Sequence, residues 1–194
     1  MSTTVVARKG GQAAIGADTL ACFGPVKESA AYVANHSKII RVGGSYLALV
    51  DEASWPFVLS HYFGKLPEPP LLESVSAIFE TAQELHRVLK EEYFLNASAG
   101  TDGTGTFEST GLLCLIANRR GIFGLYDLRE ALEYTKFFAF GSGSPFALGA
   151  MHAVYDRANS AEDVVRAGLE AAVEFDTGTG APIEIHTIQL DRTS

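Results

Sequence analysis

The pattern of apolar and polar residues predicts two β-hairpins in the first fifty residues. Each hairpin has two short, largely apolar stretches that flank a pair of glycines, a combination typical of a tight turn between antiparallel strands. The first hairpin covers residues 4–17, with glycines at positions 10 and 11. The second covers residues 38–50, with glycines at positions 43 and 44. The chain is therefore expected to begin with four strands.

Helical patterns follow the strands. A first helix is predicted from Trp55 to Phe63, with Ser54 as its cap. A second is predicted because apolar residues recur at steps of three and four and form one stripe. The residues of that stripe are Val75, Ile78, Ala82, Leu85 and Leu89. Two more helices are expected, one capped by Ser144 and one starting at Ser160, where Asp163 completes a capping box.

The order of these elements predicts the fold class. Further strands are expected at residues 112–117, 122–127, 137–140 and 183–190. Strands grouped in this way favour antiparallel sheets over repeated β-α-β units. The helices need apolar faces to cover, so we expect an α+β fold, a four-layer α-β-β-α sandwich of two stacked antiparallel sheets. Residues 96–110, rich in Gly, Ser and Thr, are predicted to form a mobile loop.

Composition indicates one globular domain, residues 1–194. The chain is 47% hydrophobic and 20% charged, values typical of a domain with its own core. Its net charge of −8 argues against a nucleic-acid partner. No apolar run approaches the ~20 residues of a membrane helix, and no secretion signal opens the chain. Together with the two cysteines, which are expected to be reduced, these features predict a cytoplasmic protein.

The N-terminal segment carries the most specific candidate chemistry. Ser2, Thr3 and Thr4 follow the initiator Met1, and Asp18 ends the first hairpin. Removal of Met1 would give Ser2 an α-amine beside its own hydroxyl, which places a base and a nucleophile on one residue. The five histidines share no metal-like spacing, so structural roles are expected for them. We expect no metal and no cofactor.

Three further motifs accompany this segment. Lys38 opens the second hairpin, in the sequence Ser-Lys-Ile-Ile-Arg at 37–41. A Gly-Ser-Gly turn centred on Ser142 precedes a predicted helix, and Asp176 and Thr179 lie in an Asp-Thr-Gly-Thr-Gly turn before the last strand. With the N-terminal segment, these motifs resemble the proteasome β-subunit family, in particular the HslV-like branch of N-terminal-nucleophile hydrolases and its betaproteobacterial proteasome homologues. The resemblance spans nearly the whole chain.

The resemblance leaves two candidate nucleophiles. The family pattern has a nucleophile at the mature N-terminus and an aspartate sixteen residues later, and counting sixteen residues back from Asp18 reaches Ser2. Matching Thr3 and Thr4 to the family's Thr-Thr start instead requires a one-residue deletion in the hairpin. Ser2 is therefore the preferred nucleophile and Thr3 the alternative.

The resemblance also implies the roles of the other motif residues. Lys38, held by Asp18, would favour the reactive state of the nucleophile electrostatically. Ser142 would hydrogen-bond the terminal amine, and Asp176 and Thr179 would orient it. The gap between Asp18 and Lys38 is four residues longer than in the family, which implies an insertion between positions 22 and 36. A rival lysine at position 27 lies in a loop without a strand pattern.

One family motif is missing. The family has a Gly-Gly pair after the second hairpin, where a backbone N–H forms the oxyanion hole, whereas this chain has Val-Asp-Glu-Ala-Ser at 50–54. A backbone donor does not depend on its side chain, so the hole is expected at Asp51 or Glu52. Carboxylates at this position would oppose a developing oxyanion unless they point away, and they would favour basic side chains in a substrate.

The expected function is that of a self-compartmentalising, threonine-type peptidase whose Ser2 or Thr3 attacks peptide bonds. One alternative is a catalytically silent proteasome-like ring or scaffold; another is a phosphate- or nucleotide-binding module at residues 141–144. The resemblance implies a homo-oligomer, a stacked double ring of six- or seven-fold symmetry. Peptides or unfolded proteins are the expected substrates, an ATP-dependent unfoldase is a candidate partner, and no membrane partner is expected.

Overall fold

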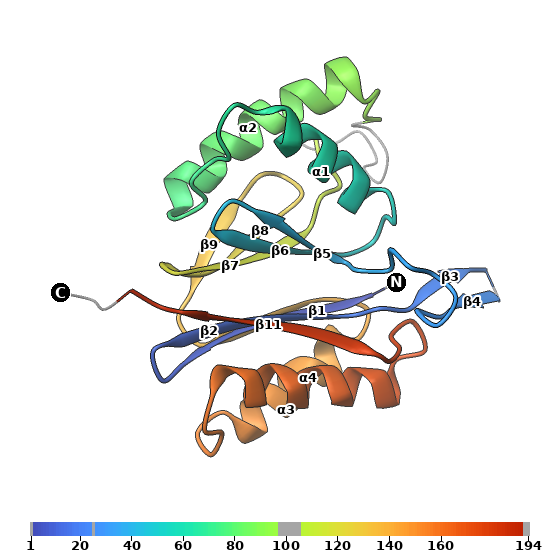
Figure 1. The fold of residues 1–194 in the computed structure, drawn as a ribbon, viewed down its shortest axis with the longest axis vertical. Helices are drawn as coiled ribbons and strands as arrows, with labels where there is room; N and C mark the ends of the chain where they lie inside the picture. Colours follow the sequence, from blue (N-terminus) through green and yellow to red (C-terminus); the bar gives the residue numbers. More distant parts are fainter. Residues whose placement is uncertain (1, 25, 97–105, 192–194) are drawn as a thin grey trace.

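The computed structural model describes residues 2–24, 26–96 and 106–191 and has four layers (Figure 1). Two helices cover the outer face of one sheet, and two more cover the outer face of a second sheet stacked on the first. Every strand pairing within these sheets is antiparallel. The predicted α-β-β-α sandwich is therefore confirmed.

The first sheet has four strands in the order β10-β1-β2-β11 and the second has five in the order β5-β6-β7-β8-β9. The first comprises β1 (Thr3–Lys9), β2 (Gln12–Asp18), β10 (Phe137–Gly141) and β11 (Ile183–Gln189). The second comprises β5 (Ile39–Val42), β6 (Ser45–Leu49), β7 (Cys114–Asn118), β8 (Gly121–Leu125) and β9 (Ala131–Tyr134). A separate two-stranded hairpin, β3 (Ala21–Phe23) and β4 (Val26–Glu28), projects near the start of β1.

The four helices are α1 (Trp55–Lys65), α2 (Val75–Glu92), α3 (Ser144–Val154) and α4 (Ala161–Phe175). The predicted stripe of α2 is buried except for Val75, which is 39% exposed. The capping box of α4 is present, because the Ser160 hydroxyl accepts from the Asp163 N–H and the Asp163 carboxylate accepts from the Ser160 N–H. The start of α3 differs from the prediction: Gly143 occupies the N-cap position, and Ser144 is the first helical residue.

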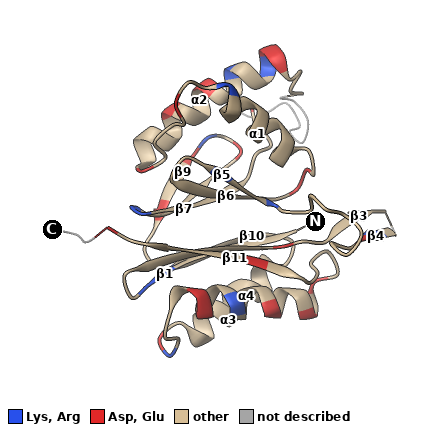
Figure 2. Cartoon of the chain, viewed as in Figure 1, with Lys and Arg blue, Asp and Glu red and all other residues tan. Residues whose placement is uncertain are grey.

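Successive side chains of β1 pack into two different hydrophobic cores. Val5 packs with α3 and α4, whereas Val6 packs into the layer between the two sheets, because successive side chains of a strand point to opposite faces. Charged residues lie mainly on the helices and at the ends of strands (Figure 2). The described helices include none that is long and apolar enough to cross a membrane. Of the predicted 96–110 loop, residues 97–105 lie outside the described residues.

Candidate active site

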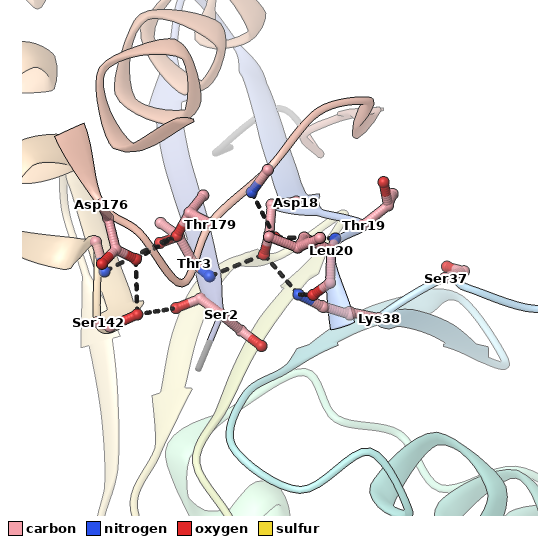
Figure 3. A network of polar contacts seen from close by, with 12 residues as sticks. Ser2, Thr3, Asp18, Thr19, Leu20, Ser37, Lys38, Ser142, Asp176 and Thr179 are labelled. Carbon is pink, nitrogen blue, oxygen red and sulfur yellow. Dashed lines mark hydrogen bonds and ion pairs between the residues drawn. The ribbon is translucent and has the colours of Figure 1, made fainter. Parts of the chain in front are cut away.

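Asp18 is a fully buried carboxylate at the end of β2 that joins three parts of the chain (Figure 3). Its Oδ1 accepts from the Thr3 N–H at 2.9 Å and from Lys38 Nζ at 2.7 Å. Its Oδ2 accepts from the backbone N–H groups of Leu20 at 3.1 Å and Gly180 at 3.0 Å. A buried charge is tolerated only when it is paired and hydrogen-bonded. Asp18 therefore fixes the start of β1 against Lys38.

Lys38 comes from the opposite sheet, directly before β5. Its ammonium group reaches across to Asp18 and also donates to the Leu20 carbonyl at 2.7 Å, and its side chain is 14% exposed. Lys38 and Asp18, which were predicted to act as a pair, are thus in direct contact. The rival, Lys27, lies exposed in β4 and makes no such contact among the described residues.

The Thr3 hydroxyl is held on two sides. Asp176 Oδ2 accepts from Thr179 Oγ1 at 2.5 Å, so the single hydroxyl hydrogen of Thr179 is used there. Thr3 Oγ1, 2.6 Å from Thr179 Oγ1, must then be the donor of that pair. The Gly143 N–H donates to Thr3 Oγ1 at 3.1 Å. A directed chain of hydrogen bonds therefore runs from Gly143 through Thr3 and Thr179 to Asp176.

Ser2 is held through its backbone and is 5% exposed. Its carbonyl oxygen accepts from the Ser142 N–H at 2.9 Å, while the Ser142 hydroxyl donates to Asp176 Oδ2 at 2.7 Å and lies 3.5 Å from the same carbonyl. Alternation along β1 places Ser2 on the opposite face from Thr3, toward the layer between the sheets. In Figure 3, Ser2 lies between Ser142 and Lys38, and its hydroxyl points away from Ser142.

Asp176 remains ionised at the edge of this network. Burial acts to raise its pKa, but hydrogen bonds from Thr179, Ser142 and the Gly178 backbone outweigh that effect and hold the pKa below its usual value. A carboxylate hydrogen-bonded in this way is a permanent acceptor. It sets the direction of both hydroxyl hydrogen bonds that end on it.

Glycines allow the close backbone approach that the site requires, and no role was predicted for their backbone groups. Gly141 has φ +96°, and a Cβ there would lie 1.9 Å from the Ser2 carbonyl oxygen. A Cβ on Gly143 would lie 2.3 Å from Thr3 Oγ1. Gly180 supplies one of the four donors to Asp18. The presence of glycines in the two turn motifs was the sequence signal for these close contacts, but the sequence does not show which atoms approach the glycines.

The turn expected to supply the oxyanion hole lies beside Lys38, since the Leu49 N–H donates to the Lys38 carbonyl at 2.9 Å. Asp51 has φ +73°, and the Glu52 N–H donates to the Val50 carbonyl at 3.2 Å. Both acidic side chains are exposed. No hydrogen bond joins either residue to the Asp18 and Asp176 networks within the described part of the chain.

The site therefore consists of protein groups on several elements. Ser2, Thr3, Asp18, Lys38, Ser142, Asp176 and Thr179 form one connected set of contacts. Across residues 2–24, 26–96 and 106–191, no group of three or more His, Cys, Asp and Glu side chains could hold a metal ion. The arrangement provides a carboxylate-paired ammonium, an anchored N-terminal backbone and a second, hydroxyl-bound carboxylate.

Comparison with known proteins places this arrangement in a family. No model of a known protein family matches the sequence. A stretch of 73 residues is 40% identical to the proteasome subunit beta of Methanocaldococcus jannaschii; it covers 36% of this chain and only 33% of the archaeal protein. The structure of HslV from Trypanosoma brucei superposes with a TM-score of 0.67, at 18% identity over 96% of this chain and 99% of that one, which is a likeness of fold.

The bacterial proteasome homologue BPH of Thiobacillus denitrificans is much more similar. It is 46% identical, the match covers 98% of this chain and 100% of that one, and the TM-score is 0.93. The same protein in complex with epoxomicin gives a TM-score of 0.91 with the same identity and coverage. Identity at this level over the full length, together with the shared four-layer fold, shows that the chain belongs to the proteasome β-subunit and HslV-like family of N-terminal-nucleophile hydrolases.

Proposed function

We propose that this chain is a peptidase subunit that hydrolyses peptide bonds with the hydroxyl of Ser2. The proposal requires that Met1, which lies outside the described residues, is removed, so that Ser2 has an α-amine. The observation that carries the proposal is the Lys38–Asp18 pair, which contacts the Thr3 N–H directly after Ser2. Family membership and the epoxomicin complex of the Thiobacillus denitrificans relative support it.

The proposed chemistry uses groups of the chain alone. The α-amine, with a pKa of about 7.7–8.0 in a model peptide, accepts the hydroxyl proton as the oxygen attacks a peptide carbonyl. The Lys38 ammonium stabilises the negative charge that develops on the attacking oxygen. The amine then returns the proton to the leaving nitrogen, and an ester to the enzyme forms. Attack of water on that ester, with the amine again as base, releases the product and restores Ser2.

Thr3 is the less favourable nucleophile in this arrangement. Its hydroxyl donates to Thr179 and accepts from Gly143, so attack on a substrate would break this chain of hydrogen bonds. Its side chain also points to the face occupied by α3 and α4, away from the layer that Lys38 enters. In our proposal Thr3 positions the backbone after the nucleophile, and Ser142, Asp176 and Thr179 fix the amine and its surroundings.

A peptide epoxyketone tests the proposal, because this warhead reacts with both a hydroxyl and an α-amine on one residue. We expect one adduct per chain by intact mass, with Met1 absent, and tandem mass spectrometry should map it to Ser2. Ser2→Ala should form no adduct, whereas Thr3→Ser, which keeps the hydroxyl, should still react. An adduct on Thr3, or none on a chain that has lost Met1, would refute the assignment to Ser2.

A catalytically silent ring subunit is the second candidate. The specific observation in its favour is that the Glu52 N–H, an expected oxyanion donor, already donates to the Val50 carbonyl. Retention of Met1 together with the absence of an adduct would support this alternative. Turnover of a fluorogenic peptide by the wild type, lost in Ser2→Ala, would exclude it.

We further propose that the subunits assemble into a stacked double homo-oligomeric ring of six- or seven-fold symmetry, which encloses the sites and admits peptides or unfolded proteins. Family membership supports this assembly, and an ATP-dependent unfoldase is the candidate partner that would supply the substrates. Native mass spectrometry should give a mass near twelve or fourteen subunits. The two free thiols, Cys22 and Cys114, suit the reducing cytoplasm in which we place the protein.

A further inference from the structure

A second polar site lies on the outer helical layer, apart from the Asp18 network. It is a cavity of about 560 Å³ that is lined by α2, by residues 106–108 before β7 and by Arg129 after β8. Two of its lining side chains are more than nine-tenths buried: His86 on α2 is 7% exposed, and Arg129 in the turn between β8 and β9 is 8% exposed. Buried residues of these types in a cavity are expected to have specific partners.

The contact between His86 and Arg129 fixes the state of the imidazole. Arg129 Nη1 lies within hydrogen-bond distance of His86 Nδ1. A guanidinium can only donate, so Nδ1 must accept and the ring hydrogen must be on Nε2. Burial, together with the charge of Arg129, lowers the pKa of His86, consistent with a neutral ring. Nε2–H is therefore a buried donor, and it has no hydrogen-bond acceptor among the described residues.

Among the described Lys and Arg residues that line this cavity, Arg129 is the one that forms no ion pair with a carboxylate. Arg87 is held by Glu84 and Glu91, and Lys90 donates to Glu108 at 2.6 Å. Figure 2 shows such basic and acidic residues together along α2. Within the described part of the chain, Arg129 makes no ion pair, and its recorded side-chain partners are His86 and the Glu108 carbonyl, both through Nη1. Its Nε and Nη2 donors are thus available to a ligand.

The backbone of Arg129 has an uncommon conformation in the turn between β8 and β9. Its φ is +69°, a conformation that residues other than glycine rarely adopt. The Arg129 N–H donates to the Tyr126 carbonyl at 2.8 Å, which closes the turn. Strained backbone of this kind is concentrated at functional sites and ligand clamps. Arg129 itself lines the cavity and is only 8% exposed.

We propose that this cavity binds a small oxyanion, a carboxylate or a phosphate, whose oxygens accept from Arg129 and from His86 Nε2–H. A guanidinium fork matches the geometry of either anion. The Glu108 carboxylate lies 3.6 Å from His86 Nε2 but is already bound by Lys90, so it borders the site and competes with the ligand. Because the chain has a net charge of −8, non-specific attraction of anions does not account for such binding.

Calorimetric titration of the full protein with inorganic phosphate, and separately with acetate, tests the proposal at constant ionic strength. We expect saturable binding of at least one of these anions, with one site per chain. Arg129→Gln should weaken it about tenfold or more, the effect expected when a hydrogen bond to a charged group is lost. Arg166→Gln, which removes an equal charge from the Arg166–Glu162 pair on α4, should leave it unchanged. Epoxyketone labelling of Ser2 should be the same in all these proteins.

Two further variants keep the test decisive if Arg129→Gln does not fold. His86→Phe keeps an aromatic ring but removes the Nε2–H, so it should weaken binding. Glu108→Gln removes the competing carboxylate and should tighten binding, by about tenfold or less because Glu108 is exposed to solvent. The proposal is overturned if neither anion binds to the wild type or to Glu108→Gln. It is also overturned if His86→Phe and a folded Arg129→Gln both bind as the wild type does.

Discussion

Asp18 ends β2 of the first sheet and Lys38 directly precedes β5 of the second, and the 2.7 Å contact between Nζ and Oδ1 ties the two sheets together at the start of β1. Because the same Oδ1 accepts from the Thr3 N–H, the ion pair fixes the backbone on which the proposed nucleophile depends. The stability of the fold and the proposed chemistry thus both depend on the Asp18 carboxylate.

Replacing Asp18 by Asn should destabilise the fold. The carboxylate accepts two hydrogen bonds on each oxygen, and an amide can accept on one side only. In either orientation, two donors would face an NH₂ group. We expect a loss of about 3–5 kcal/mol in the free energy of unfolding, the cost of breaking a buried pair, measured by denaturant titration.

Lys38→Met is the matched comparison for Asp18→Asn. It removes the ammonium group and leaves the fully buried Asp18 carboxylate with its three backbone donors but without a counter-ion, so a loss of similar size, about 3–5 kcal/mol, is expected. Epoxyketone labelling should fall sharply in both variants. Wild-type stability in Asp18→Asn would contradict the structural role that we assign to the carboxylate.

Replacing Gly141 by Ala should displace Ser2. The new Cβ would lie 1.9 Å from the Ser2 carbonyl oxygen, and φ +96° is unfavourable for alanine. We expect loss of epoxyketone labelling together with a lower melting temperature in calorimetry. Gly149→Ala in α3 is the control: a Cβ there meets nothing within 4 Å, so labelling should persist and stability should rise by up to ~1 kcal/mol. Equal labelling in the two variants would argue against this account of Gly141.

Replacing Asp51 by Gly should increase both stability and turnover. Glycine adopts φ +73° without the strain of a Cβ, which we expect to be worth about 0.5–1 kcal/mol, and a negative charge beside the expected oxyanion donor is lost. Asp51→Ala separates the two effects, because it removes the charge but keeps the Cβ. It should raise kcat for a fluorogenic peptide without raising the melting temperature; a kcat unchanged in both variants would place the oxyanion donor elsewhere.

The contribution of Asp176 to the free energy of unfolding should depend on pH, and it should be smaller at low pH. Hydrogen bonds from Thr179, Ser142 and Gly178 lower the pKa of Asp176 in the folded state, against the opposing effect of burial. The folded state therefore holds this proton less tightly than the unfolded state, whose carboxyl titrates near the ordinary value of about 3.9. The stabilisation is fully present above that value and is lost as the pH falls through the lower, folded-state pKa.

Asp176→Asn tests this dependence. The variant should be less stable than the wild type at pH 7, and the difference in free energy of unfolding should shrink as the pH is lowered below 4. Urea titrations of both proteins at pH 7, 5, 4 and 3 measure it. A difference that stays constant across this series would show that the carboxylate charge does not contribute.

The sequence was sufficient for elements whose signals are local. The stripe of α2 predicted its buried face except at Val75, which is exposed because it lies in the first turn of the helix. The capping box of α4 involves only residues three positions apart. By contrast, β9 (Ala131–Tyr134) was not predicted: its residues are half-buried or exposed, and its strand conformation depends on pairing with β8.

The candidate site, too, could be predicted from the sequence only in part. The chemical types and order of Ser2, Asp18, Lys38, Ser142, Asp176 and Thr179 are properties of the sequence, and they were enough to indicate a family. The sequence left Ser2 as the preferred nucleophile and Thr3 as the alternative, because the spacing to Asp18 favours Ser2 whereas a one-residue deletion in the hairpin would favour Thr3. Their side chains are assigned to opposite faces of β1 only once α3, α4 and the second sheet are in place.

Local periodicity and motif spacing thus determined the layers, the capping signals and the candidate residues of this protein. Tertiary structure alone decided which donors meet Asp18, which hydroxyl faces Thr179, and that His86 and Arg129 share a cavity, since His86 and Arg129 are 43 positions apart. The physical reason is that hydrogen bonds act over about 3 Å. Such contacts between residues distant in sequence exist only after the apolar layers have packed.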